Sequence, residues 1–247
     1  MKKGYKFFIS ILLVCIFFFL PFGSSIKVEA AEQTSSFKPT QTLLIGDSRL
    51  FYLCENTPVE DYFYVLCQGG ADSSWIDKNG VWSFASIGGA YNTLTNDGTG
   101  SDVKIELSES LLKSKGITTI IYMIGINDLF IQNLNSIAGL EMYNAQEKIE
   151  TNLQLLKDKT GCRVVYNNIG FIDMTKTSNA YYVGVKMTSN AQIAWFNYLL
   201  QWDEKVDCYA GAPCMTSADG VHYAAEDSSL IFYNINLSLW QLICSAK

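Results

Sequence analysis

Ser48 is the residue whose setting in the chain most suggests chemistry. It follows Gly46-Asp47 at the end of a short apolar run, 42–45, whose composition is typical of a buried strand, and a helix-compatible stretch comes next. A serine at such a turn has its hydroxyl in a crevice and its backbone N–H at a helix start, where negative charge is stabilised. Because Gly-Asp-Ser is also ordinary turn composition, the hypothesis needs partners elsewhere in the chain.

Four further groups could act together with Ser48. His222 is the only histidine, and Asp219 precedes it by three residues. Asn127 follows the long apolar run 117–124, and the pair Gly69-Gly70 follows another apolar run. Acyl transfer requires a nucleophile, a base, a carboxylate that orients the base, and donors for an oxyanion. These residue types supply all four, provided that the fold brings them to one place.

The order of the predicted elements explains how that could happen. Strand-forming runs alternate with segments of helical periodicity, which predicts an α/β fold with a parallel sheet and helices on both faces. The carboxyl ends of parallel strands open on the same edge of a sheet. The predicted strands are 42–46, 62–66, 117–124, 163–166 and 206–209, and the predicted helices are 108–115, 136–159, a helix capped by Ser189, and 224–243.

The four blocks Gly46-Asp47-Ser48, the glycine turn, Gly125-x-Asn127-Asp128 and Asp219-x-x-His222 resemble those of the SGNH (GDSL-like) hydrolase family in order and spacing. The resemblance covers essentially the whole chain after its N-terminal segment. It implies a flavodoxin-like three-layer α/β/α fold and esterase or lipase-type chemistry without a cofactor.

The resemblance also implies a role for each matching position. Ser48 would be the nucleophile, His222 the base, and Asp219 the group that orients His222. The backbone N–H groups of Ser48 and Gly70 and the side-chain amide of Asn127 would form the oxyanion hole.

Asp47, the glycine turn and Arg49 differ from the other positions in their role or in their fit to the family pattern. Asp47 would brace the turn rather than react. The second block is the loosest match, and Gly69 could serve in place of Gly70. Arg49 departs from the family pattern, which more often has an aliphatic residue there. A salt bridge at the helix start is the favoured interpretation, and contact with a substrate carboxylate or leaving oxygen is the alternative.

The N-terminus resembles an export signal. Lys2, Lys3 and Lys6 precede an apolar run from Phe7 to Phe22, and Val28-Glu29-Ala30 fits a small-x-small cleavage site. This predicts a signal peptide at 1–30, a polar lead-in at 31–40 and one catalytic domain at 41–247, hence a secreted or cell-surface protein. An uncleaved membrane anchor is the alternative, because the apolar run is only slightly shorter than the roughly 18 residues that suggest a span.

Charge narrows the possible partners. The chain has 18 basic and 24 acidic residues, a formal charge of −6, and loss of the four lysines and one glutamate in 1–30 would make it −9. An acidic chain without basic runs is a poor candidate for nucleic acid or an anionic membrane. A small-molecule or glycan ester is therefore the expected partner, while the oligomeric state stays open.

Cysteine usage leaves two interpretations open. The six cysteines after Cys15 allow 15 full disulfide pairings in an exported chain, and buried thiols are equally compatible with the sequence. The local pair Cys208–Cys214 is the favoured disulfide. A single histidine and the absence of C-x-x-C argue against a metal site. The six are Cys54, Cys67, Cys162, Cys208, Cys214 and Cys244.

The sequence thus favours a secreted serine esterase that removes O-acyl groups, most plausibly O-acetyl groups, from a carbohydrate or cell-wall glycan. A lipase, lysophospholipase or thioesterase with the same site is one alternative, and a non-catalytic glycan-binding module on a hydrolase fold is another. The expected rim of the site is the polar insertion 77–104 with Trp82, Phe84 and Tyr91, together with the loop 210–218.

Overall fold

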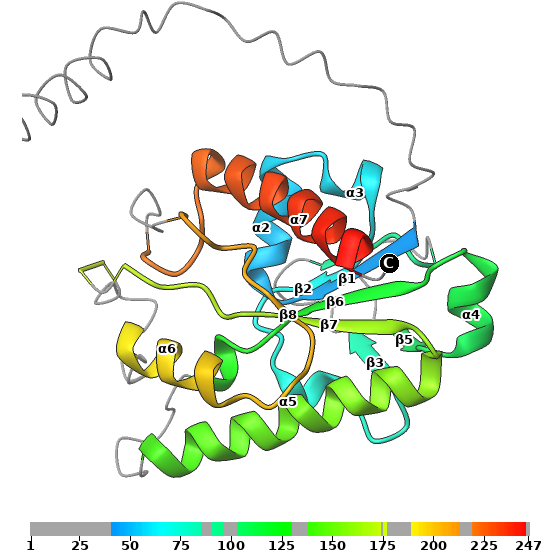
Figure 1. Cartoon of the computed structure of the whole chain (residues 1–247), viewed down its shortest axis with the longest axis horizontal. Helices are drawn as coiled ribbons and strands as arrows, with labels where there is room; N and C mark the ends of the chain where they lie inside the picture. The colour runs from blue at the N-terminus through cyan, green and yellow to red at the C-terminus, as the bar shows by residue number, and fades with distance from the viewer. Residues whose placement is uncertain are drawn as a thin grey trace, which may run out of the picture. The chain divides into compact units, whose positions relative to one another are not determined.

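The structure is a computed structural model that describes residues 41–84, 90–95, 103–129, 138–173, 175–176, 189–212 and 219–245 (Figure 1). The described residues all belong to one compact unit, Lys38–Lys247. The predicted signal peptide and lead-in lie outside them. Among the described helices, none combines the length and the apolar character needed to cross a membrane.

A six-stranded sheet forms the centre of the unit, in the order β4-β2-β1-β6-β7-β8. Strands β2, β1, β6, β7 and β8 run parallel, and β4 is added antiparallel at one edge. The parallel strands follow the chain order 2-1-3-4-5 of flavodoxin-like sheets. The strands are β1 Thr42–Gly46, β2 Tyr64–Gln68, β4 Ala90–Asn92, β6 Thr119–Met123, β7 Arg163–Asn167 and β8 Lys205–Val206.

Helices cover both faces of this sheet (Figure 1). On one face lie α5 and α6, and on the other lie α2 and α7, which pack against each other. The predicted three-layer α/β/α class is therefore confirmed. The helices are α2 Ser48–Asn56, α3 Val59–Tyr62, α4 Glu109–Ser114, α5 Ala138–Thr160, α6 Asn190–Leu199 and α7 Ala225–Ser245.

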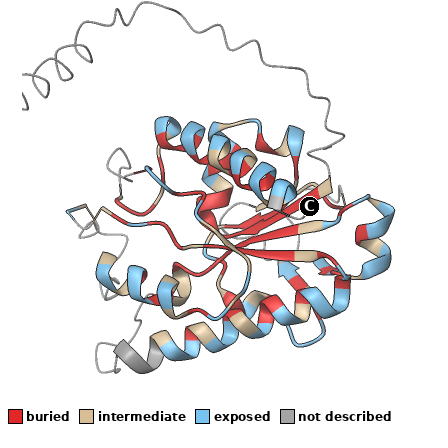
Figure 2. Ribbon diagram, viewed as in Figure 1, coloured by how far each residue is buried: buried red, intermediate tan, exposed pale blue. Residues whose placement is uncertain are grey.

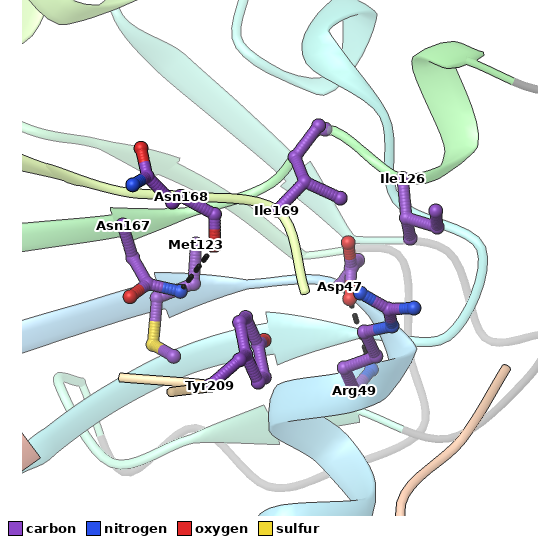
Figure 3. A pocket seen from close by; sticks show the side chains of 9 residues that line it. Asp47, Arg49, Met123, Ile126, Asn167, Asn168, Ile169 and Tyr209 are labelled. Atoms are coloured by element: carbon purple, nitrogen blue, oxygen red, sulfur yellow. Dashed lines mark hydrogen bonds between the residues drawn. The ribbon is translucent and has the colours of Figure 1, made fainter. Parts of the chain in front are cut away.

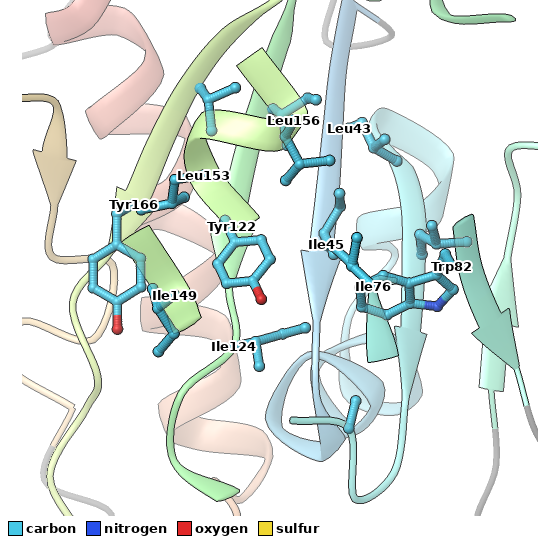
Figure 4. Packing of buried hydrophobic residues seen from close by; sticks show 14 of the residues in the cluster. Leu43, Ile45, Ile76, Trp82, Tyr122, Ile124, Ile149, Leu153, Leu156 and Tyr166 are labelled. Carbon is cyan, nitrogen blue, oxygen red and sulfur yellow. The ribbon is translucent and has the colours of Figure 1, made fainter. Parts of the chain in front are cut away.

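An apolar core fills the space between the sheet and α5 (Figure 4). Buried residues make up nearly all of β1, β2, β6 and β7 (Figure 2), as expected for parallel strands covered on both sides. Tyr122 and Tyr166 project from β6 and β7 toward Ile149 and Leu153 of α5, and all four are fully buried. This packing holds the strands in register, so the positions of their carboxyl ends are well defined.

The helix boundaries follow local sequence signals closely. Ser108 caps α4 by accepting from the Leu111 N–H, and Ser189 forms a complete capping box with Gln192 at the start of α6. These hydrogen bonds satisfy backbone donors that have no partner inside the helix. Both helix starts were predicted.

Two parts of the predicted organisation are wrong. The strand predicted at 62–66 begins at Tyr64, because Val59–Tyr62 form the short helix α3. The polar insertion 77–104 is not a plain surface loop, since it supplies β4 to the main sheet, while β3 (Val81–Phe84) and β5 (Val103–Glu106) pair as a separate two-stranded sheet. Trp82 is 0% exposed and lies in the core (Figure 4), so it cannot stack on a substrate at a rim.

Candidate active site

Ser48 occupies a strand-to-helix turn. β1 ends at Gly46, and Asp47 caps α2 by accepting from the Arg49 N–H at 2.9 Å, which makes Ser48 the first residue of the helix. The turn is tight, since a Cβ on Gly46 would lie 2.5 Å from the Leu50 Cβ. Glycine is therefore required at position 46. Ser48 itself is only 9% exposed, and its hydroxyl points toward a neighbouring side chain and not toward bulk solvent.

That neighbour is His222. Its Nε2 lies 2.8 Å from the Ser48 Oγ, and its Nδ1 lies 2.5 Å from the Asp219 Oδ2. The structure thus brings together the three side chains that the sequence predicted for nucleophile, base and orienting acid. Their arrangement permits a proton to pass from the hydroxyl to the imidazole while the carboxylate holds the ring.

Asp219 also shapes the loop that carries His222. Its Oδ1 accepts from the backbone N–H groups of Val221 at 2.8 Å and His222 at 3.0 Å. Partial burial by itself would raise the pKa of the Asp219 carboxyl, but the hydrogen bonds from the His222 ring and from both backbone groups hold that pKa well below its usual range. The carboxylate therefore stays charged and remains a fixed acceptor for the imidazole.

Tyr52 is a neighbour of the histidine that sequence reasoning missed. Its ring centroid lies 4.5 Å from that of His222, and the residue is 42% exposed. The signal for it was present, because Tyr52 is four residues after Ser48 and so shares its helix face. The ring covers one side of the imidazole and limits its movement.

Two of the predicted oxyanion donors lie at the ends of β2 and β6, the strands on either side of β1. Gly70 follows β2 in a turn closed by the Ala71 N–H to Gln68 carbonyl bond, and its φ of +77° is the left-handed region that favours glycine. Asn127 follows β6 and donates from Nδ2 to the Ala71 carbonyl at 2.8 Å. A primary amide carries two N–H donors, so this contact orients the amide without using its full capacity.

A second set of contacts holds Ser73, three residues after Gly70, and so fixes the chain that follows the glycine turn. The Asp128 carboxylate accepts from the Ser73 N–H at 3.0 Å and from the Ser73 hydroxyl at 2.5 Å, while Asn152 of α5 donates to the Ser73 carbonyl at 2.7 Å. Burial raises the pKa of Asp128 to about 7, against the two hydrogen bonds from Ser73, which favour the charged form. The motif had included Asp128 without assigning it a role.

Arg49 differs from both expectations for it. The side chain is 3% exposed, so it cannot meet a substrate from solvent, and it is not a surface ion pair at the helix start. Its guanidinium donates to the carbonyls of Gly170 at 2.7 Å and Val221 at 3.0 Å, and more weakly to that of Phe171 at 3.4 Å. Arg49 therefore connects α2, the helix that begins at Ser48, to the loop that carries His222.

Two aromatic rings complete the surroundings of this arginine. Its guanidinium carbon lies 5.2 Å from the ring centroid of Tyr223 and 5.5 Å from that of Tyr209, and the two rings stack on each other. Such contacts favour a buried cation. Arg49, which departs from the family pattern, thus has backbone carbonyls and two aromatic rings arranged around its charge.

A small pocket lies behind the nucleophile turn (Figure 3). The space between its walls is too narrow to admit a water molecule, so it is no substrate site. Asp47 points into this region, where burial raises its pKa to about 6, opposed mainly by the charge of Arg49. The lining residues are Asp47, Arg49, Met123, Gly125, Ile126, Asn167, Asn168, Ile169 and Tyr209.

The last two predictions from the sequence concern metal ligands and the cysteines. The described part of the chain holds no group of three histidine, cysteine, aspartate or glutamate side chains arranged to bind a metal ion. Cys54, Cys67, Cys162, Cys208 and Cys244 are free thiols. The favoured Cys208–Cys214 pair cannot be placed, because Cys214 and the rest of 213–218 lie outside the described residues.

Comparison with solved structures adds to this picture. A protein from Bacteroides fragilis assigned as an acylhydrolase has a TM-score of 0.52 at 14% identity, over 81% of this chain and 86% of its own. A carbohydrate acetylesterase from Sinorhizobium meliloti has a TM-score of 0.52 at 13% identity, over 82% and 99%. No protein-family model and no curated protein matches the sequence. The two structural likenesses thus support the predicted α/β fold.

Proposed function

We propose that this protein is a secreted serine ester hydrolase that works through an acyl-enzyme. The observation that carries the proposal is the relay of Ser48, His222 and Asp219, with its two contacts of 2.8 and 2.5 Å. The fold shared with an acylhydrolase and a carbohydrate acetylesterase supports it. No metal or cofactor is needed for this chemistry.

Each group has a defined task in the proposed reaction. The Ser48 Oγ attacks the ester carbonyl while the His222 Nε2 takes its proton, and Asp219 stabilises the imidazolium that forms. The N–H groups of Ser48 and Gly70 and the Asn127 amide stabilise the oxyanion. His222 then protonates the leaving alcohol, and in the second half it activates the water that releases the acid and frees Ser48.

The substrate we propose is an O-acyl ester, in particular an O-acetyl ester of a carbohydrate or cell-wall glycan. A predicted export signal would place the protein where such polymers occur, and an acidic chain suits a soluble polymer better than an anionic membrane. The insertion 77–104 is rich in small polar residues, and the loop 210–218 carries Thr216 and Ser217. Such side chains can hydrogen-bond hydroxyl groups. The burial of Trp82 removes one of the aromatic residues first expected at the rim.

The first test separates an enzyme from a glycan-binding module. Reaction with a fluorescent fluorophosphonate should label the wild type and leave Ser48→Ala unlabelled, whereas Ser110→Ala, which changes an exposed serine of α4, should label normally. Ester hydrolysis by Ser48→Ala should fall by several orders of magnitude with an unchanged melting temperature. Normal turnover by that variant would refute the catalytic assignment.

The second test separates an acetylesterase from a lipase or thioesterase. The measurement is kcat/KM for aryl acetate, octanoate and palmitate, together with acetate release from an acetylated glycan. The acetate ester should be hydrolysed fastest, since each added methylene contributes only about 0.8 kcal/mol and only where an apolar wall receives it. A rate that rises steadily with chain length would assign the site to lipids instead.

A further inference from the structure

Two buried cysteines face each other beside the active site. Cys54 lies on the buried side of α2 with Leu50 and Leu53, and it is 5% exposed. Cys67 is the fourth residue of β2, is fully buried, and is paired in register with Gly46 of β1. One residue therefore sits on the helix that begins at the nucleophile, and the other sits next to the glycine that precedes it.

The alternation of side chains along β2 explains why Cys67 faces α2. Leu66 belongs to the core shared with α5, so its neighbour Cys67 projects to the opposite face of the sheet, where α2 packs. Tyr91 of β4 is the register partner of Cys67, and its ring centroid lies 5.3 Å from that of Phe51 in α2. Cys67 therefore faces the part of α2 that carries Cys54. Two thiols that meet in this way across a helix–strand interface have the proximity that a disulfide needs.

The other described cysteines have different surroundings. Cys162 donates from Sγ to the Ile117 carbonyl at 3.6 Å, Cys208 lies 4.0 Å from the Ser238 hydroxyl, and Cys244 is exposed near the end of α7. Among the described cysteines, Cys54 and Cys67 are therefore the two buried ones that the packing of α2 on β2 brings together. This pair is not the one that the sequence favoured.

We infer that Cys54 and Cys67 are a redox site that forms an intramolecular disulfide linking α2 to β2. Each thiol gives up one proton and one electron as the S–S bond forms. A small-molecule disulfide, or the disulfide of a thiol oxidoreductase, takes up the two electrons and two protons and leaves as two thiols. The inference does not depend on the proposed esterase function.

The timing of this oxidation follows from the environment of the thiols. The hydrogen bond with Cys67 and burial together raise the pKa of the Cys54 thiol well above its usual range. Because thiolates are the species that attack disulfides, the folded reduced protein resists oxidation. The bond should form while the chain folds in an oxidising compartment, before α2 closes over β2.

The position of the bond has a structural consequence. β2 ends at Gln68, directly before Gly69 and Gly70, and α2 begins at Ser48. A disulfide between Cys54 and Cys67 would thus join the element of the nucleophile to the element of a proposed oxyanion donor. The link encloses the short segment with α3, and such a closed loop stabilises by restricting the unfolded chain.

The test uses the complete chain without its predicted signal. The reduced protein is unfolded, refolded with oxidised and reduced glutathione, blocked with iodoacetamide and mapped by mass spectrometry without reduction. A peptide pair joined through Cys54 and Cys67, lighter by two hydrogens than its reduced parts, is expected. Protein kept folded and reduced before glutathione is added should form this link far more slowly. Alkylated Cys54 and Cys67 in the oxidatively refolded protein, or a link from either one to another cysteine, would overturn the inference.

Variants give a second readout. The oxidised wild type should melt higher than the reduced protein by on the order of 5–15 °C. Cys67→Ala should lose that increment together with the linked peptide. Cys244→Ser, which alters an exposed thiol, should keep both. An increment that survives in Cys67→Ala would contradict the assignment, and this result can be read even if the variant has lower stability overall.

Discussion

The Asn127 amide illustrates how much one side chain can depend on its neighbours. It follows β6, and its Nδ2 is oriented by the Ala71 carbonyl at 2.8 Å, beside the Gly70 turn. An amide held in this way does not have to reorganise when charge develops on a substrate oxygen. Its contribution should therefore appear in the chemical step rather than in substrate binding.

Asn127→Ala should lower kcat by about 10²–10³, the usual loss for one oxyanion donor, with little change in KM. Steady-state kinetics on an aryl acetate measure both constants. Asn127→Asp keeps the size of the side chain but replaces the donor with an acceptor, and should be slowed at least as much. If either variant raised KM alone, Asn127 would be a substrate-binding group instead.

Arg49 acts through the residues that it holds. Its guanidinium connects α2 with the carbonyls of Gly170 and Val221, and Val221 is the residue before His222. A lysine cannot reproduce this fork of donors, because its ammonium is a single point charge. Arg49 is therefore a positioning residue and not a group that touches substrate.

Arg49→Lys should lower the free energy of unfolding by about 1–3 kcal/mol, the cost of a buried acceptor left without its donor. It should also reduce kcat more than KM, because the His222 loop loses its anchor. Urea unfolding and kinetics measure the two effects. Lys113→Met, which alters an exposed ion pair with Glu109, is the matched control and should change neither. Unchanged stability and activity in Arg49→Lys would show that the contacts are incidental.

At the scale of elements, the important feature is how two strand ends are held together. Asp128 after β6 binds the backbone and hydroxyl of Ser73, and Asn152 of α5 binds the Ser73 carbonyl. The turn that follows β2 is thus connected to the end of β6, on the other side of β1, and to helix α5. Because the core between α5 and the sheet is closely packed, this connection gives the oxyanion side of the site a rigid support.

Asp128 also predicts a pH dependence of stability. Its pKa is about 7 in the folded protein, above the ordinary value of 3.8, so between these values the folded state holds a proton that the unfolded chain has lost. This contribution to stability is complete below about pH 4 and is lost as the pH rises through about 7.

Asp128→Asn should therefore lose less stability than the wild type between about pH 4 and pH 7, as measured by urea unfolding across this range. Asp47, whose pKa is also raised, makes stability fall with pH in the same direction. Both proteins contain Asp47, so it does not contribute to the difference between their slopes. Asp158→Asn, an exposed change on α5, should keep the slope of the wild type. Equal slopes for Asp128→Asn and the wild type would contradict the assignment.

At the scale of the whole molecule, we propose separate roles for the compact unit and the N-terminal segment. The described residues belong to one compact unit that begins at Lys38, whereas the predicted export signal occupies 1–30. An apolar run preceded by lysines directs a chain to the export machinery, and a small-residue site after it permits cleavage. The proposed export would thus depend on this segment and not on the fold.

Expression of the full chain in an exporting bacterial host should yield a soluble extracytoplasmic protein whose first residue is Ala31. N-terminal sequencing and intact mass identify this end. Ala30→Glu, which places a large charge at the proposed cleavage site, should leave the precursor uncleaved. A wild type that stays in the membrane fraction at full mass would support the anchor instead.

Local signals in the sequence predicted several features correctly. The Gly-Asp-Ser turn, the Asp219-x-x-His222 spacing, the caps at Ser108 and Ser189 and the alternation of strands and helices all depend on residues a few positions apart. Steric and hydrogen-bonding preferences at that range act within one turn or one helix start, so they can be recognised without the fold.

The tertiary structure alone decided what depends on packing between distant segments. The sequence did not reveal that Trp82 lies in the core, or that Arg49 binds the carbonyls of Gly170 and Val221. Nor did it reveal that Cys54 and Cys67 are buried where α2 packs on β2. Each of these outcomes depends on which faces of helix and strand meet across the sheet. A side chain's burial and partners are set by that three-dimensional juxtaposition, and its neighbours in the chain do not encode it.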